Sequence, residues 1–241
     1  MSELKTEQIS VPLPKGDERF DAYLAQPAGA ARGGIVVLQE IFGVNADIRG
    51  TADWLAGEGY MALAPDLFWR QERNVSLTDG SQAEWQKAFA LMTAYDAEAG
   101  VADIQASIDT LRARLGQAGA TSQKVGTLGF CLGGKMVYLA ACRTDGDAHA
   151  SYYGVGIQDM LAEAQNITAP TLLHIAGQDE FVPPEAQAAI RAGLEDKPLV
   201  ETHIYAAQDH AFARNGGMHF DADAARLAHG RSLALFQKAL G

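Results

Sequence analysis

The hydrophobic residues of this chain gather in short, uninterrupted runs. Six such runs, rich in residues that favour β-structure, lie at residues 34–38, 60–64, 125–129, 150–154, 171–176 and 200–205. A continuous apolar run of this length is typical of a strand covered on both faces, as in a parallel sheet. Residues 9–13 and 19–25 alternate in part, which predicts two earlier, antiparallel strands.

Helical periodicity fills the intervals between these runs. Within residues 101–115, five apolar residues are spaced by three and four and so share one helical face, and Gly116 and Gly119 then provide stop signals. Further helices are predicted at residues 47–57, 133–142, 184–194 and 222–240. Pro183 and Pro184 suit the start of one of them, because a missing N–H costs little at a helix N-terminus.

The alternation of strands and helices predicts one α/β domain over residues 1–241. We expect a doubly wound, mostly parallel sheet with helices on both faces. Ligands in such sheets bind beyond the carboxyl ends of the strands, so functional residues are expected just after strands. Residues 68–80 are polar and irregular, and we interpret them as a cap or lid loop rather than a domain boundary.

Composition narrows the choice of partners. The chain has 241 residues, of which 48% are hydrophobic, enough for a sizeable core. Its 30 acidic and 19 basic residues give a net charge of −11, which disfavours a nucleic-acid partner. Residues 1–16 lack the apolar core of a signal peptide, and no run reaches the roughly 18 apolar residues that span a membrane. We therefore expect a cytoplasmic protein without membrane contact.

The residues around Cys131 form the first candidate site. A predicted strand runs into Gly129-Phe130-Cys131-Leu132-Gly133-Gly134, and a predicted helix follows. This is the nucleophile elbow of α/β-hydrolases, with cysteine where serine is commoner, and its small neighbours avoid clashes in a strained turn. The N-terminus of the following helix would help to hold a thiolate and an oxyanion.

An acid and a histidine follow later strands in the chain order of an α/β-hydrolase triad. Asp179 comes after the strand at residues 171–176, and His210 lies in the loop after residues 200–205. Glu180 competes for the role of the acid, and we rank Asp179 ahead because its shorter side chain comes directly after a turn. A carboxylate on one imidazole nitrogen fixes the tautomer while the other nitrogen takes the thiol proton.

The remaining histidines and the second cysteine are assigned to structure. His174 and His203 lie within strands, and Cys142 lies in an apolar stretch of a predicted helix, where a free cysteine is usually inert core. His149, His219 and His229 show no partner pattern and are interpreted as surface or hydrogen-bonded residues. With two cysteines eleven residues apart, neither a disulfide framework nor a zinc site is expected.

From about residue 19 to the last helix, the chain resembles the dienelactone hydrolase (carboxymethylenebutenolidase) family. The resemblance rests on six motifs in order, at residues 39–45 (QEIFGVN), 64–67 (APDL), 129–134 (GFCLGG), 152–156 (YYGVG), 177–179 (GQD) and 210–214 (HAFAR). It implies an α/β-hydrolase that opens a small lactone or ester through Cys131, His210 and Asp179, with an acyl-enzyme and no metal or organic cofactor.

The resemblance also implies roles around the triad. Glu40 matches a family glutamate that takes the thiol proton when substrate binds. The backbone N–H groups of Ile41 and Leu132 match an oxyanion hole. Arg214 matches an arginine that binds the substrate carboxylate, whereas its residue type alone would suggest a solvated surface position. Within the same motifs, Phe42 and Tyr153 are further candidates for substrate binding.

The chain departs from the family pattern at two positions. Trp85 stands where well-known members carry a second carboxylate-binding arginine, and Ala211 stands where they have serine. We therefore expect Trp85 to line an apolar substrate pocket and keep two alternatives open. One is a broad small-ester or thioester hydrolase without a strict carboxylate requirement. The other is a non-catalytic protein of this fold that binds a ligand or senses redox state. We expect a monomer or small homo-oligomer acting on a small molecule.

Overall fold

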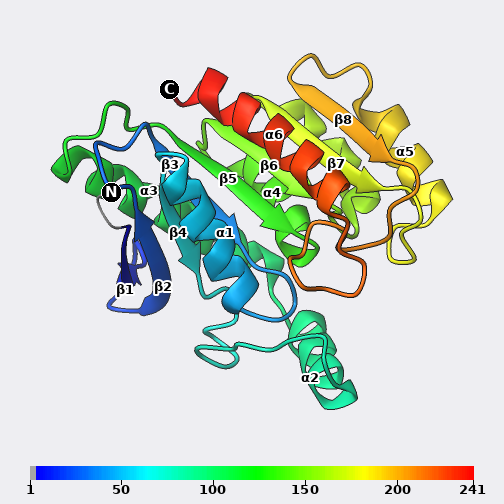
Figure 1. Cartoon of the computed structure of the whole chain (residues 1–241), viewed down its shortest axis with the longest axis horizontal. Helices are drawn as coiled ribbons and strands as arrows, with labels where there is room; N and C mark the ends of the chain where they lie inside the picture. The colour runs from blue at the N-terminus through cyan, green and yellow to red at the C-terminus, as the bar shows by residue number, and fades with distance from the viewer. Residues whose placement is uncertain (1–3) are drawn as a thin grey trace.

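A computed structural model describes residues 4–241, in which eight strands form one continuous sheet (Figure 1). Their order across the sheet is β1-β2-β4-β3-β5-β6-β7-β8. The strands are β1 (Lys5–Pro12), β2 (Arg19–Gln26), β3 (Gly34–Leu38), β4 (Met61–Pro65), β5 (Val125–Phe130), β6 (Ala148–Tyr152), β7 (Thr171–Ala176) and β8 (Val200–Tyr205).

The sheet is parallel from β4 to β8, and only β1 and β2 run antiparallel to their neighbours. Every residue of β3, β4, β5, β6 and β7 is buried, as the continuous apolar runs predicted, while β8 at the edge is only partly buried. The predicted α/β-hydrolase fold, with its doubly wound and mostly parallel sheet, is confirmed.

Helices cover both faces of the sheet. In Figure 1, α1 (Ala46–Gly57) and α6 (Ala222–Ala239) cross the near face, whereas α3 (Ala97–Gln117) and α4 (Leu132–Arg143) lie behind it. The 3-10 helix η1 (Ile157–Asn166) packs on α4, and α5 (Pro184–Leu194) packs on η1. Helix α2 (Gln82–Thr93) stands apart from the sheet at the lower edge of the view.

The position of the site follows from the strand order. β3 has β4 on one side and β5 on the other, so the chain reverses its direction of winding at β3. The loops that leave β3 and β5 therefore separate and open a crevice beyond the carboxyl ends of these strands, where such folds bind ligands. Leu38 pairs with Gly129 near those ends, which brings the next residues of each strand side by side.

The structure differs from the predicted elements at several places. β1 begins at Lys5, four residues before the strand predicted at 9–13. The strand expected at 150–154 is β6, two residues earlier, because Tyr153 has a φ of 38° and leaves the extended conformation. Helices α2 and η1 were not predicted. The start of α2 has a readable signal, since Ser81 and Glu84 have the spacing of a capping box and the hydroxyl of Ser81 accepts the N–H of Glu84.

Residues 68–80, expected as a cap or lid loop, form an ordered connection with one isolated bridge between Gly43 and Ser76. The carboxylate of Asp66 accepts hydrogen bonds from the N–H groups of Phe68 and Asn74, at 3.1 and 2.7 Å. This loop leads into α2, so its conformation decides where that helix stands.

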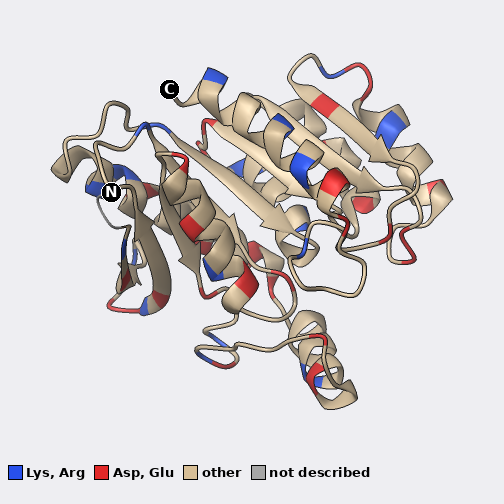
Figure 2. Cartoon of the chain, in the orientation of Figure 1, with Lys and Arg blue, Asp and Glu red and all other residues tan. Residues whose placement is uncertain are grey.

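Charged residues are distributed without large blocks of one sign on the view in Figure 2, where lysines and arginines stand singly among aspartates and glutamates. Because the protein has a net charge of −11, it does not attract an anionic ligand as a whole, and binding of such a ligand depends on local cations. In residues 4–241, none of the helices has both the length and the hydropathy that a membrane crossing requires.

Candidate active site

Cys131 lies in a tight turn between β5 and α4. Its backbone angles are ones that residues other than glycine rarely adopt. Its φ is 54° and its ψ is −113°. A non-glycine residue in such a region costs about 1–3 kcal/mol and persists only where the surroundings impose it. The N–H of Cys131 donates to the carbonyl of Tyr152 at 3.0 Å, which ties the turn to the end of β6. The turn, fixed by this hydrogen bond, thus holds the sulfur at the rim of the sheet.

The glycines beside Cys131 are required by space. A Cβ on Gly129 would lie 2.5 Å from the carbonyl oxygen of Gly133, and one on Gly134 would lie 2.5 Å from the carbonyl oxygen of Tyr152. These separations are far below van der Waals contact. Only glycine therefore lets the start of α4 pack closely against the strands.

His210 and Asp179 form a buried pair contributed by two different loops. The Nδ1 of His210 lies 2.7 Å from Oδ2 of Asp179, and the two residues are 9% and 3% exposed. Oδ1 of Asp179 accepts the N–H groups of Phe181 and Val182, at 2.9 and 3.3 Å. Glu180 is exposed, so the carboxylate that orients the imidazole is that of Asp179.

Two aromatic rings pack against the imidazole of His210. Those of Tyr153 and Phe181 contact it edge-on, with centroids at 5.0 and 4.8 Å. Burial lowers the pKa of His210, but the negative charge of a Cys131 thiolate and the hydrogen bond to Asp179 outweigh it, and the pKa is raised. The site therefore favours an imidazolium whenever the sulfur is ionised.

A second charged cluster joins three loops near the cysteine. Arg214, only 8% exposed, lies with its Nε 3.2 Å from Oε2 of Glu40 and its Nη1 3.1 Å from Oδ2 of Asp79. The Nε contact is close but poorly aligned for a hydrogen bond, whereas Nη1 donates one to Asp79. Its residue type alone would suggest a solvated surface position, but the fold buries this guanidinium between two carboxylates.

Burial raises the pKa of two carboxyl groups beside this cluster. The pKa of Glu40 is raised by loss of solvent, against the opposing charges of Arg214 and His210, and Oε1 of Glu40 has no hydrogen-bond partner among the described residues. The pKa of Asp47 is raised to about 7, by burial first and by the charge of Glu40 second. Glu40 is therefore a carboxylate that readily takes up a proton.

A small cavity of about 40 Å³ collects these side chains. The polar or reactive side chains that line it are those of Cys131, His210, Glu40 and Arg214. Its remaining walls are apolar and comprise Ile41, Phe42, Trp85, Phe89, Met92, Val155 and Phe181. The structure thus brings Trp85 and Phe42 into the same wall, with ring centroids 5.0 Å apart.

Tyr153 does not line this cavity. Its ring is 1% exposed and packs behind the imidazole of His210 and against Phe212. Tyr153, a candidate for substrate binding by its motif, thus lies against the imidazole, on a backbone with a φ of 38°.

Several residues of the site were missed by sequence reasoning. Asp79 gave no signal, because its partner Arg214 lies 135 positions away and loop contacts have no periodicity. Phe89 and Met92 follow Trp85 by four and seven residues, so the helical spacing of α2 could have placed all three on one face. Within residues 4–241, no cluster of three or more histidine, cysteine, aspartate or glutamate side chains is arranged to hold a metal ion.

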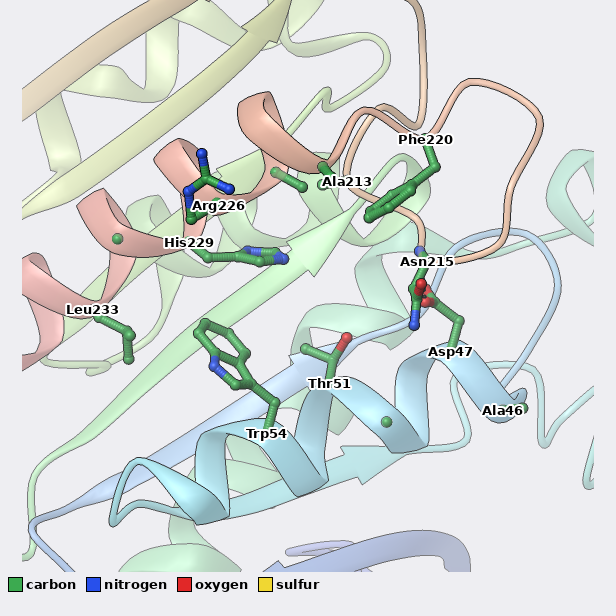
Figure 3. Close-up of a pocket in the computed structure, with 14 residues that line it drawn as sticks. Ala46, Asp47, Thr51, Trp54, Ala213, Asn215, Phe220, Arg226, His229 and Leu233 are labelled. Atoms are coloured by element: carbon green, nitrogen blue, oxygen red, sulfur yellow. Dashed lines mark hydrogen bonds between the residues drawn. The ribbon is translucent and has the colours of Figure 1, made fainter.

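A larger groove of about 720 Å³ lies between α1 and α6 (Figure 3). Trp54 and His229 face each other across it with ring centroids 4.7 Å apart, and Asp47 closes one end by accepting the N–H of Asn215. Neither Cys131 nor His210 lines this groove. The chemically equipped cavity is therefore the smaller one.

Comparison with known proteins identifies relatives along nearly the whole chain. The model of the dienelactone hydrolase family matches residues 20–240. A protein of Azospirillum brasilense is 44% identical over 234 residues, which cover 96% of this chain and 99% of that protein. A carboxymethylenebutenolidase of Pseudomonas putida is 39% identical over 228 residues, covering 95% of this chain and 94% of that enzyme.

Solved structures share the fold. A protein of Klebsiella pneumoniae superimposes with a TM-score of 0.82 at 26% identity, covering 98% of this chain and 99% of that one. A dienelactone hydrolase-like promiscuous phosphotriesterase from metagenomic libraries superimposes with a TM-score of 0.78 at 23% identity, over 98% and 99% of the two chains. At 23% identity, the similarity to the phosphotriesterase shows only that the fold is shared.

Proposed function

The chain belongs to the dienelactone hydrolase family and is a hydrolase of ester bonds, and on that premise we propose that Cys131 opens a small ester or lactone through a covalent acyl-enzyme. The observation that carries the proposal is the pair of His210 and Asp179, 2.7 Å apart, beside the cavity that Cys131 also lines. Family membership leaves the non-catalytic alternative without support.

Glu40 takes the proton of the Cys131 thiol when substrate fills the cavity. Its buried position, its raised pKa and its unpartnered Oε1 support this role. Because the thiol proton passes to Glu40, His210 keeps its own proton, stabilised by Asp179. A thiol that ionises only with substrate present also resists oxidation.

The thiolate then attacks the carbonyl carbon, and the carbonyl oxygen becomes an oxyanion. The backbone N–H groups of Ile41 and Leu132 stabilise it. Leu132 is the first residue of α4, where an N–H has no acceptor within the helix and the helix dipole adds positive potential. Ile41 follows β3 and lines the same cavity as Cys131.

The intermediate collapses when the carbon–oxygen bond to the alcohol breaks. His210 gives its proton to the leaving alkoxide, so the acyl group stays on sulfur as a thioester. Neutral His210 then takes a proton from water as the hydroxide oxygen adds to the thioester carbonyl. Breaking the carbon–sulfur bond releases the acid, and the proton on Glu40 returns to the sulfur.

Replacement of the two cysteines tests the proposal. We expect Cys131→Ala to lower kcat/KM on p-nitrophenyl acetate at least about 1,000-fold, since removing a nucleophile leaves only binding and oxyanion contacts. Cys142→Ala is the matched control, because burial raises the pKa of the Cys142 thiol to about 11 and keeps it inert. Full activity in the Cys131→Ala protein would overturn the proposal.

A further inference from the structure

The positive charge of Arg214 is already balanced inside the protein. Glu40 approaches its Nε and Asp79 accepts a hydrogen bond from its Nη1. The ring of Phe42 covers one face of the guanidinium, with the guanidinium carbon 5.0 Å from the ring centroid. Two of the three nitrogens and one face of this buried cation are therefore in contact with protein groups before any ligand arrives.

Arg214 is also the only lysine or arginine among the residues that line the cavity of Cys131, within the chain from residue 4 onward. Apart from Glu40, Cys131 and His210, the other lining residues are apolar. A substrate carboxylate would have to displace Asp79 or become a third negative group on one guanidinium. A neutral acyl chain needs only the apolar wall.

The backbone of Asp79 is fixed by its surroundings, so the side chain projects from an anchored position towards Arg214. The carbonyl of Asp79 accepts the indole N–H of Trp85 at 3.1 Å, which fixes it to the helix that supplies the apolar wall. Next to it, Glu84 accepts hydrogen bonds from the N–H of Thr78 and the hydroxyl of Ser81, at 2.9 Å each. The loop is thus organised by the start of α2.

We propose that Asp79 is a specificity-determining residue: its carboxylate occupies the site on Arg214 that an anionic substrate would need, so the enzyme selects esters with a neutral acyl group. This inference rests on the proposed function, because it assumes that substrate enters the cavity of Cys131. It gives Arg214 the role of holding Asp79 and Glu40 rather than that of an anion receptor.

The test compares two esters of equal chain length that differ only in the terminal group of the acyl chain, a methyl group or a carboxylate. These are p-nitrophenyl pentanoate and the mono-p-nitrophenyl ester of glutaric acid, with the uncatalysed rate subtracted. We expect the wild type to favour the pentanoate in kcat/KM. In Asp79→Asn, which keeps the shape and removes the charge, the ratio of glutarate to pentanoate activity should rise at least tenfold, mainly through KM.

Two further variants isolate the cause. Glu72→Gln removes a negative charge near α2, where Glu72 pairs with Lys87 outside the cavity, and should leave the ratio unchanged. Asp79→Asn combined with Arg214→Gln should abolish the gain. An unchanged ratio in active Asp79→Asn protein, or a wild type that prefers the glutarate ester, overturns the inference.

A binding measurement separates this inference from the proposed function. Titration of glutarate into Cys131→Ala protein, with and without Asp79→Asn, requires no turnover. At least tenfold tighter glutarate binding with asparagine supports the charge balance even if Cys131 is not the nucleophile. Equal dissociation constants overturn it, whatever the esterase assays show.

Discussion

At the scale of single residues, the account depends on how neighbours set charge and orientation. The imidazole of His210 has one carboxylate at 2.7 Å and two aromatic rings that restrict its tilt. Asp179 in turn is fixed by two backbone N–H groups. The backbone N–H groups hold the carboxylate of Asp179, and this carboxylate holds the imidazole of His210. Loss of the carboxylate should therefore misplace the imidazole.

Asp179→Asn tests this dependence. We expect kcat to fall by roughly 10,000-fold, because an amide favours the wrong tautomer of His210 and does not stabilise the imidazolium. The neighbouring Glu180→Gln, at an exposed position, should retain activity within about twofold. Rates on a neutral p-nitrophenyl ester measure both, and comparable losses in the two variants would contradict the assignment.

At the scale of elements, the turn from β5 into α4 is the most constrained part of the molecule. Sequence alone could predict it, because the glycine spacing around Cys131 is local and its steric reason is general. It could not predict the contact of Asp79 with Arg214, which joins the start of α2 to the loop after β8 and depends on the whole fold. A motif within one turn can be predicted from the sequence, whereas a charge pair between distant loops cannot.

Two glycine substitutions measure the constraint on α4. Gly134→Ala places a Cβ 2.5 Å from the carbonyl oxygen of Tyr152, so we expect a loss of about 3 kcal/mol in the free energy of unfolding. Gly50→Ala in α1 meets nothing within 4 Å and should stabilise the protein by about 0.5–1 kcal/mol. Urea denaturation of both variants gives the comparison, and equal effects would refute the packing argument.

At the scale of the whole molecule, the fold was predictable because its central strands are continuous apolar runs in regular alternation with helices. That pattern fixes the sheet and the edge where loops converge. The pattern of apolar runs does not predict which polar side chains the sheet buries, because each of them is a single residue within an apolar run. His149 is such a group: it lies in β6, is fully buried, and its Nδ1 lies 2.9 Å from the hydroxyl of Thr127.

Buried His149 should make stability depend on pH. Burial lowers its pKa to about 4, below the ordinary 6.5, so the unfolded chain binds the proton more readily. Its contribution is therefore complete above pH 6.5 and is lost as pH falls towards 4, by up to about 3 kcal/mol. Asp47, with a pKa raised to about 7, acts in the opposite direction over the same range.

A difference measurement separates the two. The wild type should exceed His149→Asn in free energy of unfolding by less at pH 4.5 than at pH 7.5, because asparagine does not titrate. Parallel stability curves for the wild type and His149→Asn would contradict the assignment of a depressed pKa.

The identity of the atom that carries the acyl group tests the central claim most directly. Protein mixed with excess p-nitrophenyl pentanoate, quenched in acid within one turnover and digested, should yield the peptide containing Cys131 with one pentanoyl group as a thioester. The acyl group should disappear on treatment with hydroxylamine. Turnover of the ester with the group found on another residue, or on none, would contradict the account.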